Sequence, residues 1–537
     1  MYGVSSVLDA FFGCTRSRRG ELALLAITLA ALVGCGTLPP AEPPVASSAL
    51  PPGPGSALAQ IAQRSTPAGA ESGVRLMPLG VYSLDARIQL AERAQTALDV
   101  QYYTIGNDPS GRLLLQKLRD AAARGVRVRL LVDDLYTAPI DAMLRALAAQ
   151  PNIEVRLFNP FCCARGRGLP GRYAASLFDF KRLNHRMHNK LFIADGVMAV
   201  IGGRNIGDEY FLRHAHQNFV DMDAFVIGGV VADMSAIFDR YWNSEVVRTI
   251  ASVGAPLPAA REAHGEFERR VRDEAPVAPL EPPPVDVLGY GPIGEELDAG
   301  RIGLVWGRAR VFADPPEKLL KESAALAIET SVTQDVMTAI WQARDELVVT
   351  SPYLIPGERG MKIFDVMRDR GVKVVVMTNS LAATDEPLVH NGYSRYRRPM
   401  LERGVELYEL SPTRARETKR LGAFGQSLGR LHAKTAVIDR RTVFIGSMNL
   451  DPRSASANTE FGMFVESAAL AKELLRVINI SKLESAYKLR LQPGGPGIEW
   501  ITTDGEREMI LRTEPESTPW LRLHNMFFGF FVPEQLL

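Results

Sequence analysis

The sequence is poor in three features that would otherwise indicate a class of protein. Lysine and arginine total 62 against 61 aspartate and glutamate residues, and this lack of a basic excess argues against nucleic acid as a partner. The apolar stretch 22–33 has only twelve residues, too few to span a bilayer. Cysteine occurs four times. Cys162 and Cys163 are neighbours, and because a bridge between neighbours is strained, we expect no structural disulfide.

The amino-terminal segment is typical of an export signal. Three arginines between positions 16 and 19 precede the short apolar stretch, which suits the core of a signal peptide. Leu-Val-Gly-Cys, ending at Cys35, resembles the bacterial lipoprotein signal, in which cleavage leaves an acylated cysteine as the first residue; an uncleaved anchor is the alternative. Gly36 stands directly after this cysteine, where inner-membrane lipoproteins have Asp. The segment therefore resembles the sorting signal of an outer-membrane lipoprotein. We therefore expect a signal peptide over 1–34 and a lipid-anchored protein of the bacterial envelope, on the periplasmic side.

One pattern occurs twice and is the strongest indication of function. His-x-Lys-x4-Asp appears at His188, Lys190 and Asp195 and again at His432, Lys434 and Asp439. Each copy continues with Gly-x-x-Asn at the same offsets, ending at Asn205 and Asn449. A single copy could be a surface strand with a solvated histidine and lysine, but two copies with the same downstream residues are very rare by chance.

Each copy predicts a β-hairpin, with apolar strands LFIA or TAVI before the turn and VMAVIGG or TVFIGS after it. Because residues two apart on a strand point to one face, each histidine shares a space with its lysine. An imidazole beside a fixed ammonium suits attack on a phosphodiester, since the lysine stabilises the phosphoryl oxygens. Neither histidine has the neighbours of a zinc or iron site, so we expect no metal and no cofactor.

The repetition extends outside the hairpins. LDVQYYTI at 98–105 parallels LVVTSPYLI at 347–355, and RGVRVRLLVDD at 124–134 parallels RGVKVVVMTNS at 370–380. The spacing predicts two similar α/β halves, each with a mixed sheet flanked by helices and closed by its motif hairpin. Two such halves, facing each other, would place the histidines on opposite sides of one phosphate.

The paired motifs identify the chain as similar to the phospholipase D superfamily, and their surroundings resemble its cardiolipin synthase branch. The resemblance covers about 75–490. It implies lobes at 75–245 and 306–490 with the active site between them, preceded by a Pro/Ala-rich tether at 35–74. A linker with a helical surface excursion would occupy 246–305, and 491–537 would be an extension. Its aromatic end would dip into the membrane or pack on the second lobe.

The resemblance also implies roles for individual residues. One motif histidine, usually the first, His188, would form a phosphohistidine, and His432 would protonate the leaving alcohol and deprotonate the incoming one. The sequence leaves open the opposite assignment. The remaining residues of the motifs would bind phosphoryl oxygens or support the site: Lys190, Lys434, Asn205, Asn449, Asp195 and Asp439.

Two carboxylates are candidates for orienting the histidines. Glu460 lies where the family places such a carboxylate, and Asp223 is its expected counterpart in the first half. Gly203 stands where the second copy has Ser447, so the first half lacks a hydroxyl that could contact phosphate. His390 and the basic clusters before each motif could bind anionic headgroups or be structural.

The resemblance implies a phosphatidyltransferase that makes cardiolipin from phosphatidylglycerol and a second phospholipid, either phosphatidylethanolamine or phosphatidylglycerol. A phospholipase D-type hydrolase is the alternative, and a nuclease is disfavoured by the charge balance. A non-catalytic lipid-binding lipoprotein is disfavoured by two intact motifs.

Overall fold

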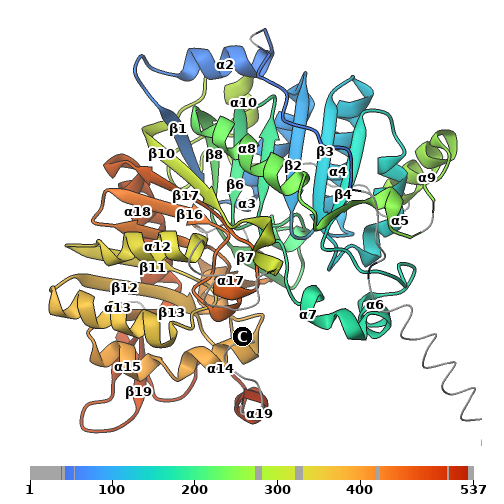
Figure 1. Ribbon diagram of the computed structural model, residues 1–537. Coiled ribbons are helices and arrows are strands. Elements are labelled where there is room, and N and C mark those ends of the chain that lie inside the picture. Colours follow the sequence, from blue (N-terminus) through green and yellow to red (C-terminus); the bar gives the residue numbers. More distant parts are fainter. Residues whose placement is uncertain are drawn as a thin grey trace, which may run out of the picture.

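One continuous sheet of 18 strands runs through both halves of the computed structural model (Figure 1). The structure describes residues 38, 43–53, 55–254, 256–272, 281–320, 331–418, 420, 422, 424–504 and 507–529. The strands of the first half are β1 (Ser72–Met77), β2 (Ala97–Tyr102), β3 (Arg127–Asp133), β4 (Ile153–Phe158), β5 (Leu191–Ala194), β6 (Met198–Gly202), β8 (Asp223–Gly228) and β9 (Val247–Thr249). Those of the second are β10 (Val305–Ala313), β11 (Glu346–Thr350), β12 (Lys373–Asn379), β13 (Glu406–Leu410), β15 (Thr435–Ile438), β16 (Thr442–Gly446), β17 (Phe461–Glu466), β18 (Ala486–Leu491), β19 (Ile498–Asp504) and β20 (Arg507–Leu511).

The two halves repeat the same strand order. From the middle outward, the first half runs β1, β8, β6, β5, β2, β3, β4, β9. The second runs β10, β17, β16, β15, β11, β12, β13, β18 and then adds β19 and β20. β1 and β10 pair antiparallel at the junction, with Ser72 opposite Gly307. The predicted fold class, two similar α/β halves, is confirmed.

Helices cover both faces of this sheet. The α-helices of the first half are α2 (Ala57–Ser65), α3 (Gly80–Arg93), α4 (Pro109–Ala123), α5 (Asp141–Ala148), α6 (Leu169–Ala175), α7 (Phe180–Leu183) and α8 (Val230–Trp242); α9 (Ala260–Arg272) and α10 (Ile293–Asp298) follow. Those of the second half are α12 (Val332–Trp341), α13 (Gly357–Asp369), α14 (Pro387–Ser394), α15 (Arg397–Glu402), α16 (Pro412–Glu417), α17 (Pro452–Ser456), α18 (Ala468–Glu484) and α19 (Pro519–Gly529). Short 3-10 turns are η1 (Ala138–Ile140), η2 (Leu177–Asp179), η3 (Asp208–Tyr210), η4 (Ile250–Ser252) and η5 (Pro316–Leu320).

The packing makes three layers, with one core shared by the halves. Side chains of α8 and α18, such as Phe238 and Leu474, belong to one apolar cluster that includes strands of both halves. On the other face each half has its own cluster, under α3 and α4 in the first and under α12 and α13 in the second. The shared core joins the halves without a flexible connection, which is what a site built from both of them requires.

Both motif hairpins form as predicted. β5 pairs antiparallel with β6, and β15 pairs with β16. Asp195 and Asp439 have positive φ angles of 52° and 51° at the turns, a conformation that aspartate adopts more readily than most residues. Nearly all side chains of the four strands are buried, as expected for central strands covered on both faces.

The folded body begins earlier and ends later than predicted. Helix α2 lies inside the expected tether, and its Leu58 and Ile61 join the core of the first half because they share one apolar face. The segment 43–53 is also held by the body, for example where Ser47 N–H donates to Asn243 Oδ1 at 3.0 Å. The expected linker contains β9, which pairs with β4, and β19 and β20 of the expected extension widen the second half of the sheet.

The expectation of no structural disulfide is wrong, because the structure joins Cys162 and Cys163. The strain argument rests on the usual Cα separation, about 4.4–6.8 Å, whereas these Cα atoms are 3.8 Å apart. That separation is the ordinary spacing of adjacent residues across a trans peptide bond, so the bridge closes between direct neighbours in the chain. The expected signal peptide, Cys35 and the end of the aromatic tail lie outside the described residues. Within them, we find no helix that combines the length and apolar character needed to span a bilayer.

Candidate active site at the junction of the two halves

Each motif histidine is held by the backbone of the opposite half. Met187 and Thr459 form a parallel bridge, and the His188 N–H donates to the Thr459 carbonyl at 2.8 Å. On the other side, β7 (Gln217–Val220) pairs parallel with β14 (Leu428–Leu431), and the His432 N–H donates to the Val220 carbonyl at 2.8 Å. These two crossings bring the separate motifs into one site.

The side chain of each histidine also meets a carboxylate from the opposite half. His188 Nδ1 lies 3.0 Å from Glu460 Oε2, and His432 Nδ1 lies 2.6 Å from Asp221 Oδ2. Both carboxylates are fully buried. A hydrogen bond from Nδ1–H to a carboxylate fixes the tautomer in which Nε2 carries the lone pair, and it stabilises the imidazolium when Nε2 is protonated.

The assignment of Asp223 as the second orienting carboxylate is wrong, since Asp221 has that place. Asp223 instead forms a buried ion pair with Arg87, with Nη2 and Oδ2 2.9 Å apart, and also accepts a hydrogen bond from the Ser83 hydroxyl. Asp221 directly follows Val220, whose carbonyl accepts the His432 N–H, as Glu460 directly follows Thr459, whose carbonyl accepts the His188 N–H. The parallel pairing that makes these positions equivalent connects different halves, so it was not visible in the spacing within one half.

The first motif has Gly203 where the second has Ser447. This difference follows from the different lengths of the two orienting carboxylate side chains. In the second half, the Ser447 hydroxyl donates to Glu460, so it supports the carboxylate rather than facing the substrate space. In the first half, a Cβ at position 203 would lie 2.2 Å from Asp221 Oδ1. The shorter aspartate reaches His432 only by lying against the backbone, where a side chain at position 203 does not fit.

Both motif lysines are buried. Charged groups of one half shift the pKa values of groups in the other half. Lys190 Nζ donates to the His188 carbonyl at 2.7 Å, and Lys434 Nζ donates to that of His432. Burial lowers the pKa of Lys190 well below its usual value, and it lowers the pKa of Lys434 to about 8. The charge of Lys434 further lowers the pKa of Lys190.

Burial also favours the neutral form of both histidines in the free protein. It lowers the pKa of His188 to about 4 and also lowers the pKa of His432, with the neighbouring lysines adding to the effect. Glu460 and Asp221 oppose this shift, and their own pKa values are lowered by the histidines they contact. A neutral imidazole oriented by a carboxylate has the properties of a nucleophile or a general base.

The motif asparagines lie in the same buried region. The side-chain amide of Asn205 donates to the Tyr210 hydroxyl at 3.0 Å. Within the described part of the chain, the side-chain oxygens of Asn205 and Asn449 are buried and find no hydrogen-bond partner. Buried polar atoms are rarely left in this state. The two lysines give this region the positive charge that suits an anionic, oxygen-rich group, whereas the unpartnered amide oxygens can only accept hydrogen bonds.

The motif aspartates lie at the far ends of their hairpins and bind backbone. Asp195 accepts hydrogen bonds from the N–H groups of Gln95, Thr96 and Ala97. Asp439 accepts the equivalent bonds from Arg344, Asp345 and Glu346. Both therefore attach the hairpin to the start of the neighbouring strand, β2 or β11, and neither touches the histidines.

Several supporting residues carried no recognisable signal in the sequence. Ser454 Oγ donates to the second oxygen of Glu460 at 2.8 Å, and Asp314 Oδ2 accepts the Glu460 N–H at 2.9 Å. The ring of Tyr103 packs edge-on against His188, with centroids 5.2 Å apart. Burial raises the pKa of Asp451 to about 7, with the charge of Glu460 adding to it. Serine, aspartate and tyrosine are too common for their spacing alone to identify such roles.

The basic clusters and His390 are mainly structural. Arg172 is fully buried beside Asp134, and Arg397 pairs with Glu409 at 2.6 Å. His390 is buried, with Nε2 2.9 Å from Arg397 Nη2. These groups are partnered inside the protein, so the interpretation of His390 as a headgroup contact is wrong.

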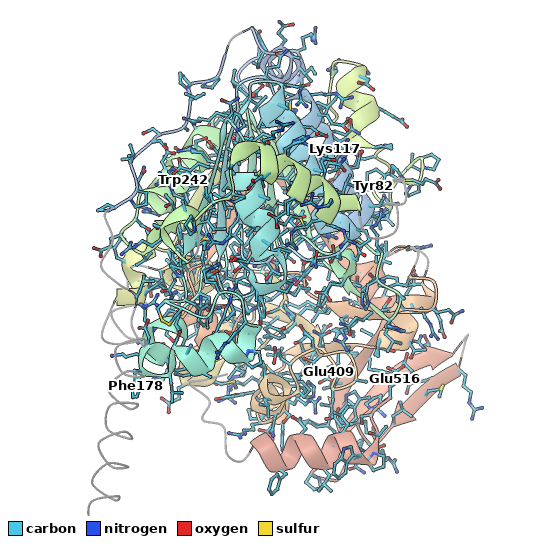
Figure 2. The ribbon with its side chains drawn as sticks, turned by 90° about the vertical axis from the view of Figure 1, so that its right-hand side faces the viewer. Tyr82, Lys117, Phe178, Trp242, Glu409 and Glu516 are labelled. Atoms are coloured by element: carbon cyan, nitrogen blue, oxygen red, sulfur yellow. A yellow bond between two sulfur atoms is a disulfide. The ribbon has the colours of Figure 1, made fainter. Side chains whose placement is uncertain are left out.

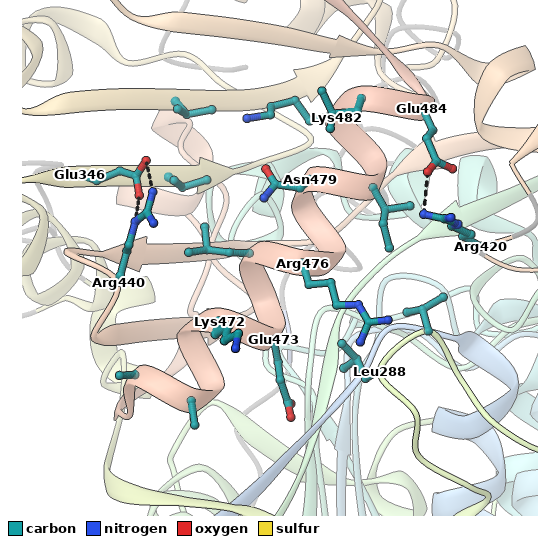
Figure 3. A pocket seen from close by; sticks show the side chains of 18 of the residues that line it. Leu288, Glu346, Arg420, Arg440, Lys472, Glu473, Arg476, Asn479, Lys482 and Glu484 are labelled. Carbon is teal, nitrogen blue, oxygen red and sulfur yellow. Dashed lines mark hydrogen bonds and ion pairs between the residues drawn. The ribbon is translucent and has the colours of Figure 1, made fainter. Parts of the chain in front are cut away.

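A cavity of about 1400 Å³ lies away from the histidines, between α18 and the amino ends of β11 and β12 (Figure 3). It is lined by Lys472, Arg476 and Lys482 on α18, and two ion pairs, Arg440 with Glu346 and Arg420 with Glu484, cross its edges. No residue of the motifs lines it. It is therefore separate from the candidate active site.

Comparisons with known proteins agree with this geometry. The family model described as "Cardiolipin synthase, PLD-like domain" matches residues 87–242 and 336–480, one segment in each half. The chain is 40% identical over 470 residues to cardiolipin synthase C of Escherichia coli (strain K12), covering 85% of this chain and 94% of that protein. It is 25% identical over 416 residues to cardiolipin synthase A of Pseudomonas putida (strain GB-1), covering 77% and 69%.

A solved structure shares the fold. The crystal structure of phosphatidylserine synthase from Haemophilus influenzae Rd KW20 matches with a TM-score of 0.55 and 13% identity, covering 89% of this chain and all of that one.

Proposed function

Because this chain belongs to the cardiolipin synthase family with phospholipase D-like domains, we propose that it is a phosphatidyltransferase. It makes cardiolipin from phosphatidylglycerol and a second phospholipid, phosphatidylethanolamine or phosphatidylglycerol. The observation that carries the proposal is the pair of buried histidines, His188 and His432, each oriented by a carboxylate of the opposite half. Hydrolysis by the same site is the alternative that the experiment below separates.

The reaction proceeds in two displacements at one phosphorus atom. His188 Nε2 attacks the donor phosphodiester, the bond from phosphorus to the headgroup oxygen breaks, and His432 gives that oxygen a proton. The resulting phosphohistidine carries the phosphatidyl group. A hydroxyl of phosphatidylglycerol then loses its proton to His432 and attacks phosphorus, the phosphorus–nitrogen bond breaks, and cardiolipin leaves with His188 restored.

The lysines supply the charge that both steps require. Lys190 and Lys434 neutralise the phosphoryl oxygens in a site with little water, where such contacts are worth more than at the surface. His188 and His432 are only 8% and 5% exposed, which favours a lipid hydroxyl over water as the acceptor.

We further propose that the protein is a lipoprotein, acylated at Cys35 and held at the periplasmic side of the outer membrane. The sequence around Cys35 supports this, as do two segments with exposed apolar side chains. Phe178, between α6 and α7, is 67% exposed (Figure 2). Leu523 on α19 is 52% exposed. Such side chains suit contact with a lipid interface. Palmitate labelling of the wild type that persists in Cys35→Ser would contradict the anchor.

The decisive test supplies the purified protein with vesicles of phosphatidylglycerol, with and without phosphatidylethanolamine, and separates the lipid products. Cardiolipin is expected, and a rise in its yield on adding phosphatidylethanolamine identifies that lipid as donor. Formation of phosphatidic acid alone would reject the transferase in favour of a lipase. The His188→Ala protein, purified in the same way, excludes activity from a contaminant.

A further inference from the structure

The halves differ in how two equivalent helices pack on the sheet. In the first half α3 and α4 are in contact, with Lys117 Nζ 2.7 Å from Glu92 and Arg124 donating to the Ala91 carbonyl at 2.7 Å. In the second half, α12 and α13 occupy the same positions in the strand order, yet a cavity of about 510 Å³ lies between them. Among the described residues, the equivalent helices are therefore in contact in the first half and border a cavity in the second.

The lining of this cavity is almost entirely apolar. Leu347 and Val349 of β11 form part of its floor, and Met337, Ile340 and Phe364 form part of its helical walls. The cavity is open to solvent, and a concave apolar surface of this kind is typical of a binding site. Its volume falls within the roughly 300–1,000 Å³ of small-molecule sites.

One end of the cavity reaches the active site. Asn449 of the second motif and its neighbours Leu450 and Asp451 contribute to the lining. The cavity follows β11 from Leu354, beyond the carboxyl end of the strand, back to Leu347 near its start. Most of its surface is apolar, with polar side chains at Asn449 and Asp451 beside the motif and at Glu358, Arg359 and Lys362 on α13.

We propose that this cavity binds one acyl chain of the phosphatidyl group that is transferred, while its phosphate lies between His188 and His432. The inference rests on the function proposed above. An amphiphile with a phosphate at one end and a long chain at the other matches a polar site that continues into an apolar channel. At the cavity edge, exposed Arg359 and Lys362 outnumber the exposed Glu358, which leaves this edge compatible with an anionic lipid.

The cavity also explains how the protein would select its donor. Contacts with an apolar chain contribute a little for each methylene, so a longer chain raises kcat/KM until the cavity is full. A chain too short to pass Asn449 would gain nothing from Met337 or Ile340. The ratio of kcat/KM for a long-chain lipid to that for a short-chain lipid therefore reports occupancy of the cavity, independently of the chemical step.

The test fills the cavity with a side chain. Met337→Trp narrows it, Met337→Ala widens it, and Thr338→Trp places the same indole on the exposed side of α12, where the residue does not line the cavity. Each protein is assayed with dipalmitoyl and dihexanoyl phosphatidylglycerol at equal mole fraction in mixed micelles. Met337→Trp should lower the long-to-short ratio roughly tenfold, whereas Thr338→Trp should leave it unchanged and Met337→Ala should retain or raise it.

A ratio that is unchanged in Met337→Trp would overturn the proposal, as would an equal loss on both lipids. A second measurement does not depend on turnover: titration with the fluorescent fatty acid cis-parinaric acid. Fluorescence should rise with the wild type and Thr338→Trp but not with Met337→Trp. If the wild type binds this probe in the cavity yet makes no cardiolipin from any lipid, the proposed function fails while the chain-binding site stands. Equal binding by all variants rejects the site.

Discussion

The two half-sites have the same components but differ in the link between histidine and carboxylate. In the first motif, His188 is held by the long side chain of Glu460, which Ser447 and Ser454 also contact. In the second, His432 is held by the shorter Asp221, with Nδ1 and Oδ2 2.6 Å apart. The two motifs therefore share the arrangement of a histidine and its carboxylate, although different neighbours support each carboxylate.

This difference bears on which histidine carries the phosphatidyl group. The pKa of His188 is lowered to about 4, so its imidazole is neutral and available for attack. The contact of His432 with Asp221 is shorter, 2.6 Å against 3.0 Å between His188 and Glu460, and a close carboxylate favours the protonated ring. A phosphate anion bound between Lys190 and Lys434 would raise the pKa of both rings. The tighter partner makes His432 the better proton donor, consistent with His188 as nucleophile.

The largest expected effect separates the two histidines. His188→Ala removes the nucleophile and should reduce kcat by roughly 10⁶-fold, whereas His432→Ala removes a proton donor and should cost about 10²–10⁴-fold. With a donor whose leaving group needs no proton, such as a p-nitrophenyl phosphodiester, His432→Ala should still form the covalent intermediate. Mass spectrometry after an alkaline denaturing quench, in which a phosphorus–nitrogen bond is stable, detects it, and a phosphate adduct found on His432 in the His188→Ala protein would reverse the assignment.

The second prediction compares the effects of substituting Asp221 and Asp223. Asp221→Asn should lower kcat by about 10²–10⁴-fold because the amide no longer fixes the productive tautomer of His432. Asp223→Asn leaves buried Arg87 without its charge partner and should cost about 3–5 kcal/mol of stability. Urea denaturation and steady-state kinetics on both proteins distinguish the effects. Equal loss of kcat in the two correctly folded variants would contradict the assignment of Asp221.

The third comparison concerns the positions that differ between the motifs. Gly203→Ala introduces a Cβ that would lie 2.2 Å from Asp221 Oδ1, so it should displace the carboxylate and lower kcat by about 10²-fold. Ser447→Gly removes one hydrogen bond to Glu460, worth about 1 kcal/mol, and should lower kcat only several-fold. KM should change little in either protein. A larger loss in Ser447→Gly than in Gly203→Ala would refute this account.

The sequence was sufficient to predict the internal repeat, but not the contacts that connect one copy of it with the other. The hairpins, the equivalent strands and the residues His188 and His432 follow from spacing within each half, because apolar periodicity and motif offsets are local properties. Asp221 could not be chosen over Asp223 in this way, since its role depends on the pairing of β7 with β14 from the other half. The fate of His390 likewise depends on Arg397 and Glu514, which only the folded chain brings together.

The smallest expected effect is a shift in the pH dependence of kcat/KM. It distinguishes the pair of His188 and Glu460 from the pair of His432 and Asp221. The pH profile of kcat/KM reports groups of the free enzyme. His188 acts in its neutral form, so activity falls as pH decreases through about 4. Glu460 raises the pKa of His188, so in Glu460→Gln that pKa falls and the acid limb moves to lower pH.

His432 acts first in its protonated form, so its deprotonation gives the alkaline limb. Asp221 raises the pKa of His432, and Asp221→Asn should therefore move the alkaline limb, also to lower pH, while leaving the acid limb in place. Profiles of the three proteins between pH 3 and pH 9, with activity at pH 6 rechecked after each exposure, test this assignment. If Glu460→Gln instead moved the alkaline limb, the protonation roles of the two histidines would be exchanged, although the cross-lobe contacts would remain as the structure has them.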